Sequence, residues 1–126
     1  MLKHKYLLGA IFWTVLIAVL SFANPSSFPK VDIVYSPDKL AHLGVYFILT
    51  VLWFLYFKRS KNWQFTKATK SAILLAFLYG VLVELLQASL TEFRSADYFD
   101  VLANTLGIIF AVVFCKWFLM KKPKLN

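Results

Sequence analysis

Four long apolar runs, separated by short polar segments, dominate the hydropathy pattern of the chain. They cover residues 6–23, 40–57, 72–90 and 101–120. A bilayer core about 30 Å thick is crossed by about 20 helical residues at ~1.5 Å rise per residue, and each run is close to that length. The pattern predicts an all-α protein, a single domain built as a four-helix transmembrane bundle with short loops.

The segments between the runs carry loop and helix-start signals. Residues 24–29 are rich in Pro, Ser and Asn, and Ser36-Pro37-Asp38 precedes the second run. The first run has an alternative interpretation, because basic residues, an apolar stretch and small residues up to Ala23 also resemble a cleaved signal peptide. Its length and its bulky Phe12 and Trp13 favour a retained helix.

Composition supports a membrane environment. Apolar residues make up 60% of the 126 residues and charged residues only 16%, with a mean hydropathy of +0.68. Soluble domains are about 25% charged, and a chain of this size cannot hide so many apolar side chains in one core. The single cysteine, Cys115, lies in an apolar run and is interpreted as structural.

The net charge of +8 is distributed in alternating segments. The N-terminus and the tail are basic, residues 24–39 are balanced, residues 58–71 hold five cations and no acid, and residues 91–100 hold three acids and one arginine. Basic segments remain on the cytoplasmic side of membranes, so both termini are expected there. Cations in these positions contact anionic lipids, and this placement argues against nucleic-acid binding.

Polar residues inside the runs gather toward one end of the predicted bundle, the outer end in this orientation. They are His42 in the second run, Glu84 and Gln87 in the third, and Asn104 near the start of the fourth, with Asp100 directly before that run. A charged side chain at the bilayer centre costs about 2.5–3.5 kcal/mol on insertion scales, so such residues are usually paired and functional. The alternative for Glu84 is a neutral acid that only fixes helix packing.

Helical spacing places these residues on shared faces. Asp38 lies one turn before His42, so its carboxylate is a candidate partner for the imidazole. Asp100 and Asn104 are likewise one turn apart, and Gly107 continues their face. If the faces meet at the bundle centre, three helices form one polar cluster.

The segment before the fourth run has both a structural and a binding interpretation. Asp97 and Asp100 suit the cap and first turn of a helix. Arg94 is the only cation in this acidic segment, and an arginine suits capture of a phosphate or carboxylate. A surface ion pair with Glu92 or Asp97 is the alternative.

The ordered polar motifs resemble those of VanZ-like membrane proteins. The resemblance extends over residues 38–111 and rests on Asp38-Lys39-x-x-His42, Gly80-x-x-x-Glu84-x-x-Gln87 and Arg94-Ser95-x-Asp97-x-x-Asp100-x-x-x-Asn104-x-x-Gly107. It implies a bacterial multi-pass protein of the cytoplasmic membrane. The namesake of the family is linked to low-level teicoplanin resistance, but many relatives occur without a resistance cluster.

These observations lead to three functional hypotheses. The first is an outward-facing site that binds or modifies an envelope lipid or lipid-linked cell-wall intermediate, without a cofactor. Its catalytic candidates are Glu84, His42 and Asp100, and its binding candidates are Arg94, Lys39, Asp38, Gln87, Asp97 and Asn104. A metal held by the catalytic candidates would be a weak signature, so none is expected.

The second hypothesis is a non-catalytic membrane protein that alters how an antibiotic such as a glycopeptide, or a partner, reaches the surface. The third is a small transporter or proton path, which the apolar inner halves of the runs disfavour. The expected partners are membrane lipids. The sequence leaves open whether a reaction is catalysed and how many copies assemble.

Overall fold

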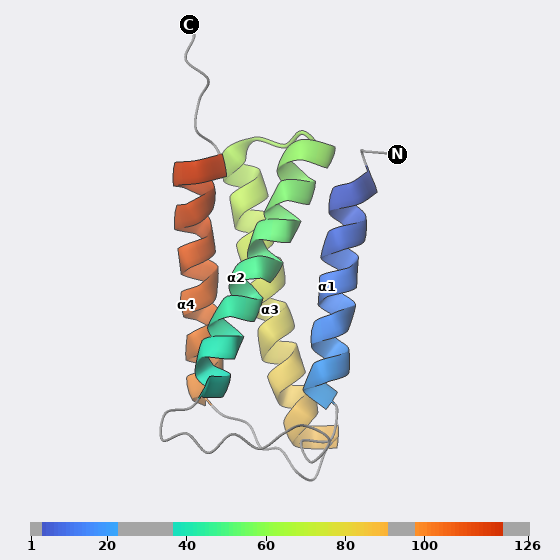
Figure 1. Cartoon of the computed structure of the whole chain (residues 1–126), viewed down its shortest axis with the longest axis vertical. Coiled ribbons are helices and arrows are strands. Elements are labelled where there is room, and N and C mark those ends of the chain that lie inside the picture. Colours follow the sequence, from blue (N-terminus) through green and yellow to red (C-terminus); the bar gives the residue numbers. More distant parts are fainter. Residues whose placement is uncertain (1–3, 23–36, 91–97, 120–126) are drawn as a thin grey trace, which may run out of the picture.

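The computed structural model describes residues 4–22, 37–90 and 98–119, and within them all regular structure is helical (Figure 1). The four helices are α1 (Lys5–Phe22), α2 (Pro37–Leu55), α3 (Phe65–Leu90) and α4 (Tyr98–Phe114). Two of them end in a wider π-helical turn: α2 continues as η3 (Tyr56–Ser60) and α4 as η4 (Cys115–Leu119). The prediction of an all-α, four-helix chain is confirmed.

All four helices are long and apolar enough to cross a membrane, over Lys5–Phe22, Leu40–Ser60, Phe65–Leu90 and Phe99–Leu119. Large apolar side chains are exposed on each of them, for example Phe12, Ile48, Leu78 and Phe110. Water would penalise such a surface, whereas lipid accommodates it. The chain is therefore a multi-pass membrane protein.

The third helix begins at Phe65, seven residues before the apolar run from which it was predicted. Lys67 and Lys70 precede that run, yet they are good helix formers and can extend their ammonium groups beyond the hydrocarbon. The connection to η3 is consequently reduced to residues 61–64. Asn62 turns the chain there with a φ of 57°, a left-handed conformation that asparagine tolerates.

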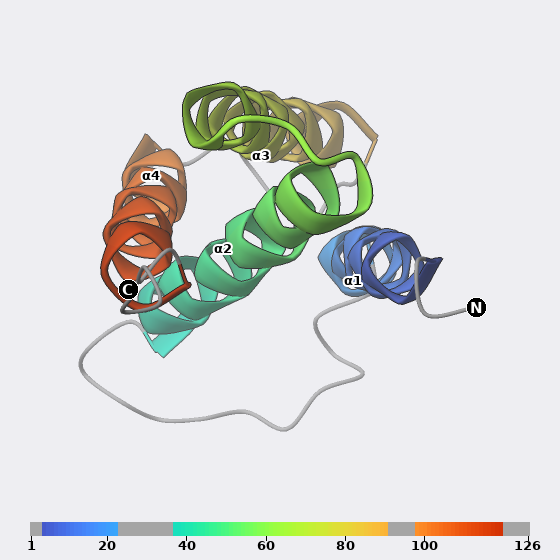
Figure 2. The same cartoon turned by 90° about the horizontal axis from the view of Figure 1, so that it is seen from above.

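Helix α2 is the centre of the bundle and packs against each of the other three helices (Figure 2). Its most extensive contact is with α4, where a Cβ atom at Gly107 would overlap the carbonyl oxygen of Leu43. Ala103 and Ala111 are also buried on α4. Small residues let membrane helices approach closely, and here they bring the backbones of α2 and α4 into contact.

The buried face of α3 consists of small residues and continues into polar residues. Ala68, Ala72, Ala76 and Gly80 follow one another at four-residue intervals and are buried, as are Glu84 and Gln87 farther along. Cys115 is buried in an apolar cluster with Phe54, as expected for a structural cysteine. The face of α3 that carries Gly80, Glu84 and Gln87 therefore points into the bundle.

Helix α1 is held at the side of the bundle by hydrogen bonds. Trp13 Nε1 donates to the carbonyl oxygen of Val45 at 3.0 Å, and Trp53 Nε1 donates to Thr14 Oγ1 at 3.0 Å. Tyr79 OH donates to the carbonyl oxygen of Thr14 at 2.6 Å. Only Ala10 and Ile17 of this helix are fully buried, so these bonds supplement a small packing contact.

Candidate functional site

Polar side chains from three helices gather at one end of the bundle, here called the polar end, where α1 and α3 finish and α2 and α4 begin (Figure 1). His42 comes from α2, and four further residues come from α3 and α4. These four residues, Glu84, Gln87, Asp100 and Asn104, are 5%, 3%, 5% and 4% exposed. The predicted faces thus do meet inside the bundle.

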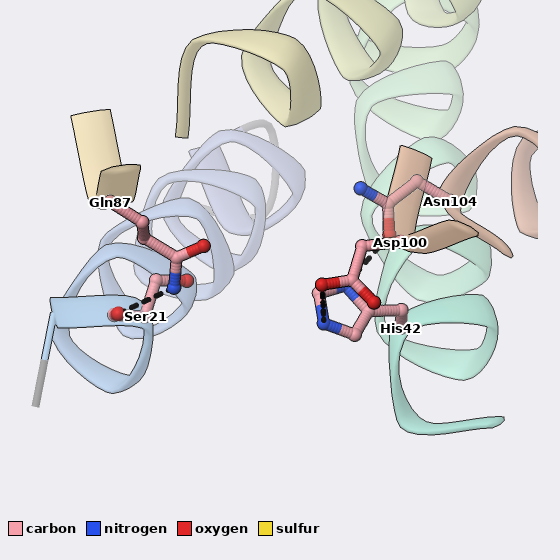
Figure 3. A network of polar contacts seen from close by, with 5 residues as sticks. All are labelled: Ser21, His42, Gln87, Asp100 and Asn104. Atoms are coloured by element: carbon pink, nitrogen blue, oxygen red, sulfur yellow. Dashed lines mark hydrogen bonds and ion pairs between the residues drawn. The ribbon is translucent and has the colours of Figure 1, made fainter. Parts of the chain in front are cut away.

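His42 is oriented by two residues of α4 (Figure 3). Its Nδ1 lies 3.0 Å from Asn104 Oδ1, and its Nε2 lies 3.7 Å from Asp100 Oδ2. An amide oxygen only accepts, so Nδ1 carries the proton of that hydrogen bond. The remaining nitrogen, Nε2, faces a carboxylate and can be protonated or can exchange a proton with a neighbouring group.

The spacing of Asp100 and Asn104 has a local cause. Asp100 lies in the first turn of α4, where its charge suits the positive end of the helix dipole. Asn104 follows one turn later on the same face, and together they place a carboxylate and an amide beside one imidazole. The prediction that these two residues share one face of a helix is confirmed, and both lie beside His42.

Helix α1 joins the site through its contact with Gln87 of α3. Its Nε2 donates to the carbonyl oxygen of Ser21 on α1 at 2.6 Å. Figure 3 shows this pair on one side of the view and His42, Asp100 and Asn104 on the other. Two polar groups therefore face each other from different helix pairs.

A partly open cavity of about 250 Å³ lies between these groups. Its polar lining consists of Ser21, His42, Glu84, Gln87 and Asn104, with Tyr46 and Gly80 beside them. Its apolar lining comes mainly from α1 and α2, with Trp13, Leu16, Ile17, Leu20 and Val45. The cavity is amphipathic, since part of its lining offers hydrogen bonds and the rest offers apolar contact.

Gly80 makes room for two side chains that line the cavity, Asn104 and Tyr46. A Cβ atom at this position would lie 3.0 Å from Asn104 Nδ2 and 3.2 Å from Tyr46 Cε2. Glycine thus lets Asn104 and Tyr46 rest directly against α3, which explains its place one turn before Glu84.

Sequence reasoning missed the aromatic and α1 contributions to the cavity. Tyr46 lies one turn after His42 on the same face of α2, and this spacing was an available signal. Trp13 and Leu20 had no such signal, because an apolar helix in lipid does not reveal from its sequence which face meets its neighbours.

Four of the predicted binding residues have no described side chain. Asp38 and Lys39 belong to the first turn of α2, and Arg94 and Asp97 lie outside the described residues. Their roles stay predictions. Within residues 4–22, 37–90 and 98–119, no three His, Cys, Asp or Glu side chains are grouped so that they could hold a metal ion.

Comparison with known proteins agrees with this architecture. The sequence model of the VanZ/LLP1 family matches residues 6–119. One relative, an uncharacterised protein of the yeast Schizosaccharomyces pombe, is 36% identical over 112 residues, which are 89% of this chain and 63% of the yeast protein. The chain thus spans less than two thirds of that relative, and no solved structure matches. The four apolar helices, the polar end and the match over nearly the whole chain lead to one conclusion: this protein belongs to the VanZ/LLP1 family.

Proposed function

We propose that the cavity at the polar end binds an envelope lipid or lipid-linked cell-wall intermediate, and that His42 acts as a general acid or base on its headgroup. The observation that carries the proposal is an amphipathic cavity with an imidazole held in the polar part of its lining. A lipid is itself amphipathic, so its chain would lie against Trp13 and Leu20 while its headgroup faces His42 and Glu84. A pocket with a few convergent polar groups is the usual form of a small-molecule site.

The orientation of His42 supports a chemical role. Asn104 keeps the proton on Nδ1, which leaves Nε2 to accept a proton from a headgroup hydroxyl or a water molecule. Asp100, 3.7 Å away, would stabilise the imidazolium that forms. Glu84 lines the same cavity and is the candidate for a second acid or base. The predicted phosphate contacts are Arg94 and Lys39.

Charge distribution suggests where this site operates. The opposite end of the bundle carries the basic segments, which favour the cytoplasmic side. The cavity would then open toward the outer leaflet. The VanZ-like resemblance implies that the membrane is the cytoplasmic membrane of a bacterium. A change in cell-wall lipids there would alter the surface that a glycopeptide such as teicoplanin meets.

A non-catalytic role is the second candidate, and one observation favours it. The polar contacts also connect helices: His42 links α2 to α4, and Gln87 links α3 to α1. In that case the site would fix the bundle, and the protein would alter the access of antibiotics or partners to the surface.

The test compares envelope lipids in cells that carry wild type, a deletion, His42→Gln or Glu84→Gln. We expect at least one lipid to differ between wild type and deletion, and both variants to resemble the deletion at equal protein level. Thr105→Val is the matched control, because this hydroxyl is one residue from Asn104 yet only bonds the Val101 carbonyl of its own helix. Identical lipid pools in wild type and deletion would rule out the enzymatic role.

A second measurement separates chemistry from helix packing. In Asn104→Ala, His42 loses the acceptor that holds the proton on Nδ1, so nitrogen NMR in a His4→Gln background should show a mixture of tautomers. We expect the effect of the protein on the envelope lipids to weaken as the preference of His42 for one tautomer is lost. Complete loss of this effect on the lipids, with an unchanged His42 spectrum, would instead favour the non-catalytic role.

A further inference from the structure

The end of the bundle opposite the cavity, here called the basic end, carries cations that have no Asp or Glu beside them in the described part of the chain. It includes the start of α1, the turns η3 and η4, and the start of α3 (Figure 1). Its described cations are Lys5, Lys58, Arg59, Lys61, Lys67, Lys70 and Lys116. Among the described residues, no Asp or Glu lies at this end, since Asp38, Glu84 and Asp100 all belong to the polar end. Such an end attracts an anion.

Two of these cations converge on one tyrosine. Arg59 Nη1 donates to Tyr6 OH at 3.4 Å, and Lys5 Nζ lies 5.0 Å from the centroid of the same ring. The contact joins η3 to α1, two segments far apart in the sequence. Positive groups that share a neutral ring repel each other, and an anion placed between them would relieve that repulsion.

At the same end, a second aromatic group positions further cations. The rings of Phe57 and Trp63 stack with centroids 4.8 Å apart and an interplanar angle of 6°. Lys67 Nζ lies 4.1 Å from the centroid of Trp63, and Lys61 Nζ lies 5.9 Å from it. These cation–π contacts hold the ammonium groups close to the helix ends.

The backbone of the connection is also ordered. The Lys61 N–H donates to the carbonyl oxygen of Tyr56 at 3.0 Å, and the Trp63 N–H donates to that of Phe57 at 3.0 Å. The site is thus preorganised by a π-helical turn, and such turns are rare and often occur at functional positions. Preorganisation lowers the entropy lost on binding.

We propose that Lys5 and Arg59, arranged around Tyr6, form a binding site for the phosphate headgroup of an anionic phospholipid. Arginine binds phosphate with two parallel hydrogen bonds, and lysine adds charge. Tyrosine and tryptophan lie at headgroup depth in membranes, and the span through Leu40–Ser60 ends beside Arg59. A lipid in the same leaflet therefore meets this site, whereas a soluble polyanion would have to approach the bilayer surface. The site is separate from the cavity.

The test uses the purified full chain in detergent with equimolar phosphatidylglycerol and phosphatidylcholine, and native mass spectrometry counts the lipids retained. We expect wild type to retain phosphatidylglycerol preferentially and Arg59→Gln to lower the ratio of the two lipids about tenfold or more, the value expected for loss of a hydrogen bond to a charged group. Lys116→Gln is the matched control, because it removes the same charge from the same end but lies on η4, across α2 from α1 (Figure 2). Its ratio should stay within about fivefold of wild type, the effect of general attraction by one basic residue.

Three outcomes would overturn the proposal. The first is an equal loss in Lys116→Gln, which would indicate general charge attraction. The second is retention of phosphatidylglycerol in Arg59→Gln; if that variant misfolds, Tyr6→Phe replaces it, because it removes only the hydroxyl that Arg59 contacts. The third is displacement of the lipid by a short single-stranded RNA or by inorganic phosphate at comparable concentration, which would indicate a soluble anion as the ligand.

Discussion

Thr69 differs from the other threonines whose hydrogen bonds the structure describes. The hydroxyls of Thr14, Thr50 and Thr105 each donate to the carbonyl oxygen four residues earlier, at 2.7, 2.7 and 2.8 Å. The hydroxyl oxygen of Thr69 is buried without a hydrogen-bond partner in the described part of the chain. A buried polar group without a partner lowers stability, so this residue is a weak point in the packing of α3.

Thr69→Val should therefore stabilise the protein. The substitution keeps the shape and removes the unsatisfied hydroxyl, with an expected gain of about 1 kcal/mol in the free energy of unfolding. Thermal unfolding of the purified chain in detergent measures the change. Thr50→Val is the control, because its hydroxyl is bonded and its loss should not raise the midpoint. A lower midpoint for Thr69→Val would show that this hydroxyl has a partner.

At the scale of helices, the pair α2–α4 positions the site, because His42 lies on one helix and its two described partners lie on the other. The same pair is in backbone contact at Gly107, one turn beyond Asn104 on the buried face. A Cβ atom there would lie 3.1 Å from the amide nitrogen of Phe47, as well as against Leu43. The close approach of the backbones is thus a condition for the contacts of His42.

Gly107→Ala should separate α2 from α4. We expect a loss of about 1–3 kcal/mol in stability, as for other overpacked positions, together with the lipid phenotype of His42→Gln. Gly44→Ala on α2 is the control, since its added Cβ meets no atom within 4 Å and alanine favours helices by up to about 1 kcal/mol. Thermal unfolding of both variants checks this, and equal midpoints would contradict the close-contact interpretation.

At the scale of the whole molecule, the two ends of the bundle are chemically different. The buried carboxyl groups and the cavity lie at one end, and the cations without described counter-ions lie at the other. With four spans, the first and last helix ends are on the same side (Figure 1). A site at either end would therefore face a side of the membrane that depends on the orientation of the bundle.

We expect the basic end to face the cytoplasm. In a Cys115→Ala background, Lys61→Cys and Ser89→Cys place a thiol at an exposed position of the basic and the polar end, respectively. A membrane-impermeant maleimide added to intact cells should label Ser89→Cys and leave Lys61→Cys unlabelled until the cells are opened. The reverse labelling pattern would show that the bundle has the opposite orientation and that the cavity faces the cytoplasmic leaflet.

The sequence by itself determined the number of helices, the membrane environment, the family resemblance and the segregation of acidic and basic residues to opposite ends. These follow from local properties: the length of an apolar run, the charges beside it and the spacing of residues along one helix. Even the face shared by Asp100 and Asn104 was visible, because one helical turn relates them.

Only the tertiary structure decided which helices meet and at what rotation. It paired His42 with Asn104 and Asp100, brought Ser21 and Trp13 of α1 to the cavity, and extended α3 back to Phe65. In lipid, an apolar face gains little by turning inward, because the surrounding chains are as apolar as the core. Packing of small residues such as Gly107 and hydrogen bonds between helices select the arrangement, and neither can be read from one helix alone.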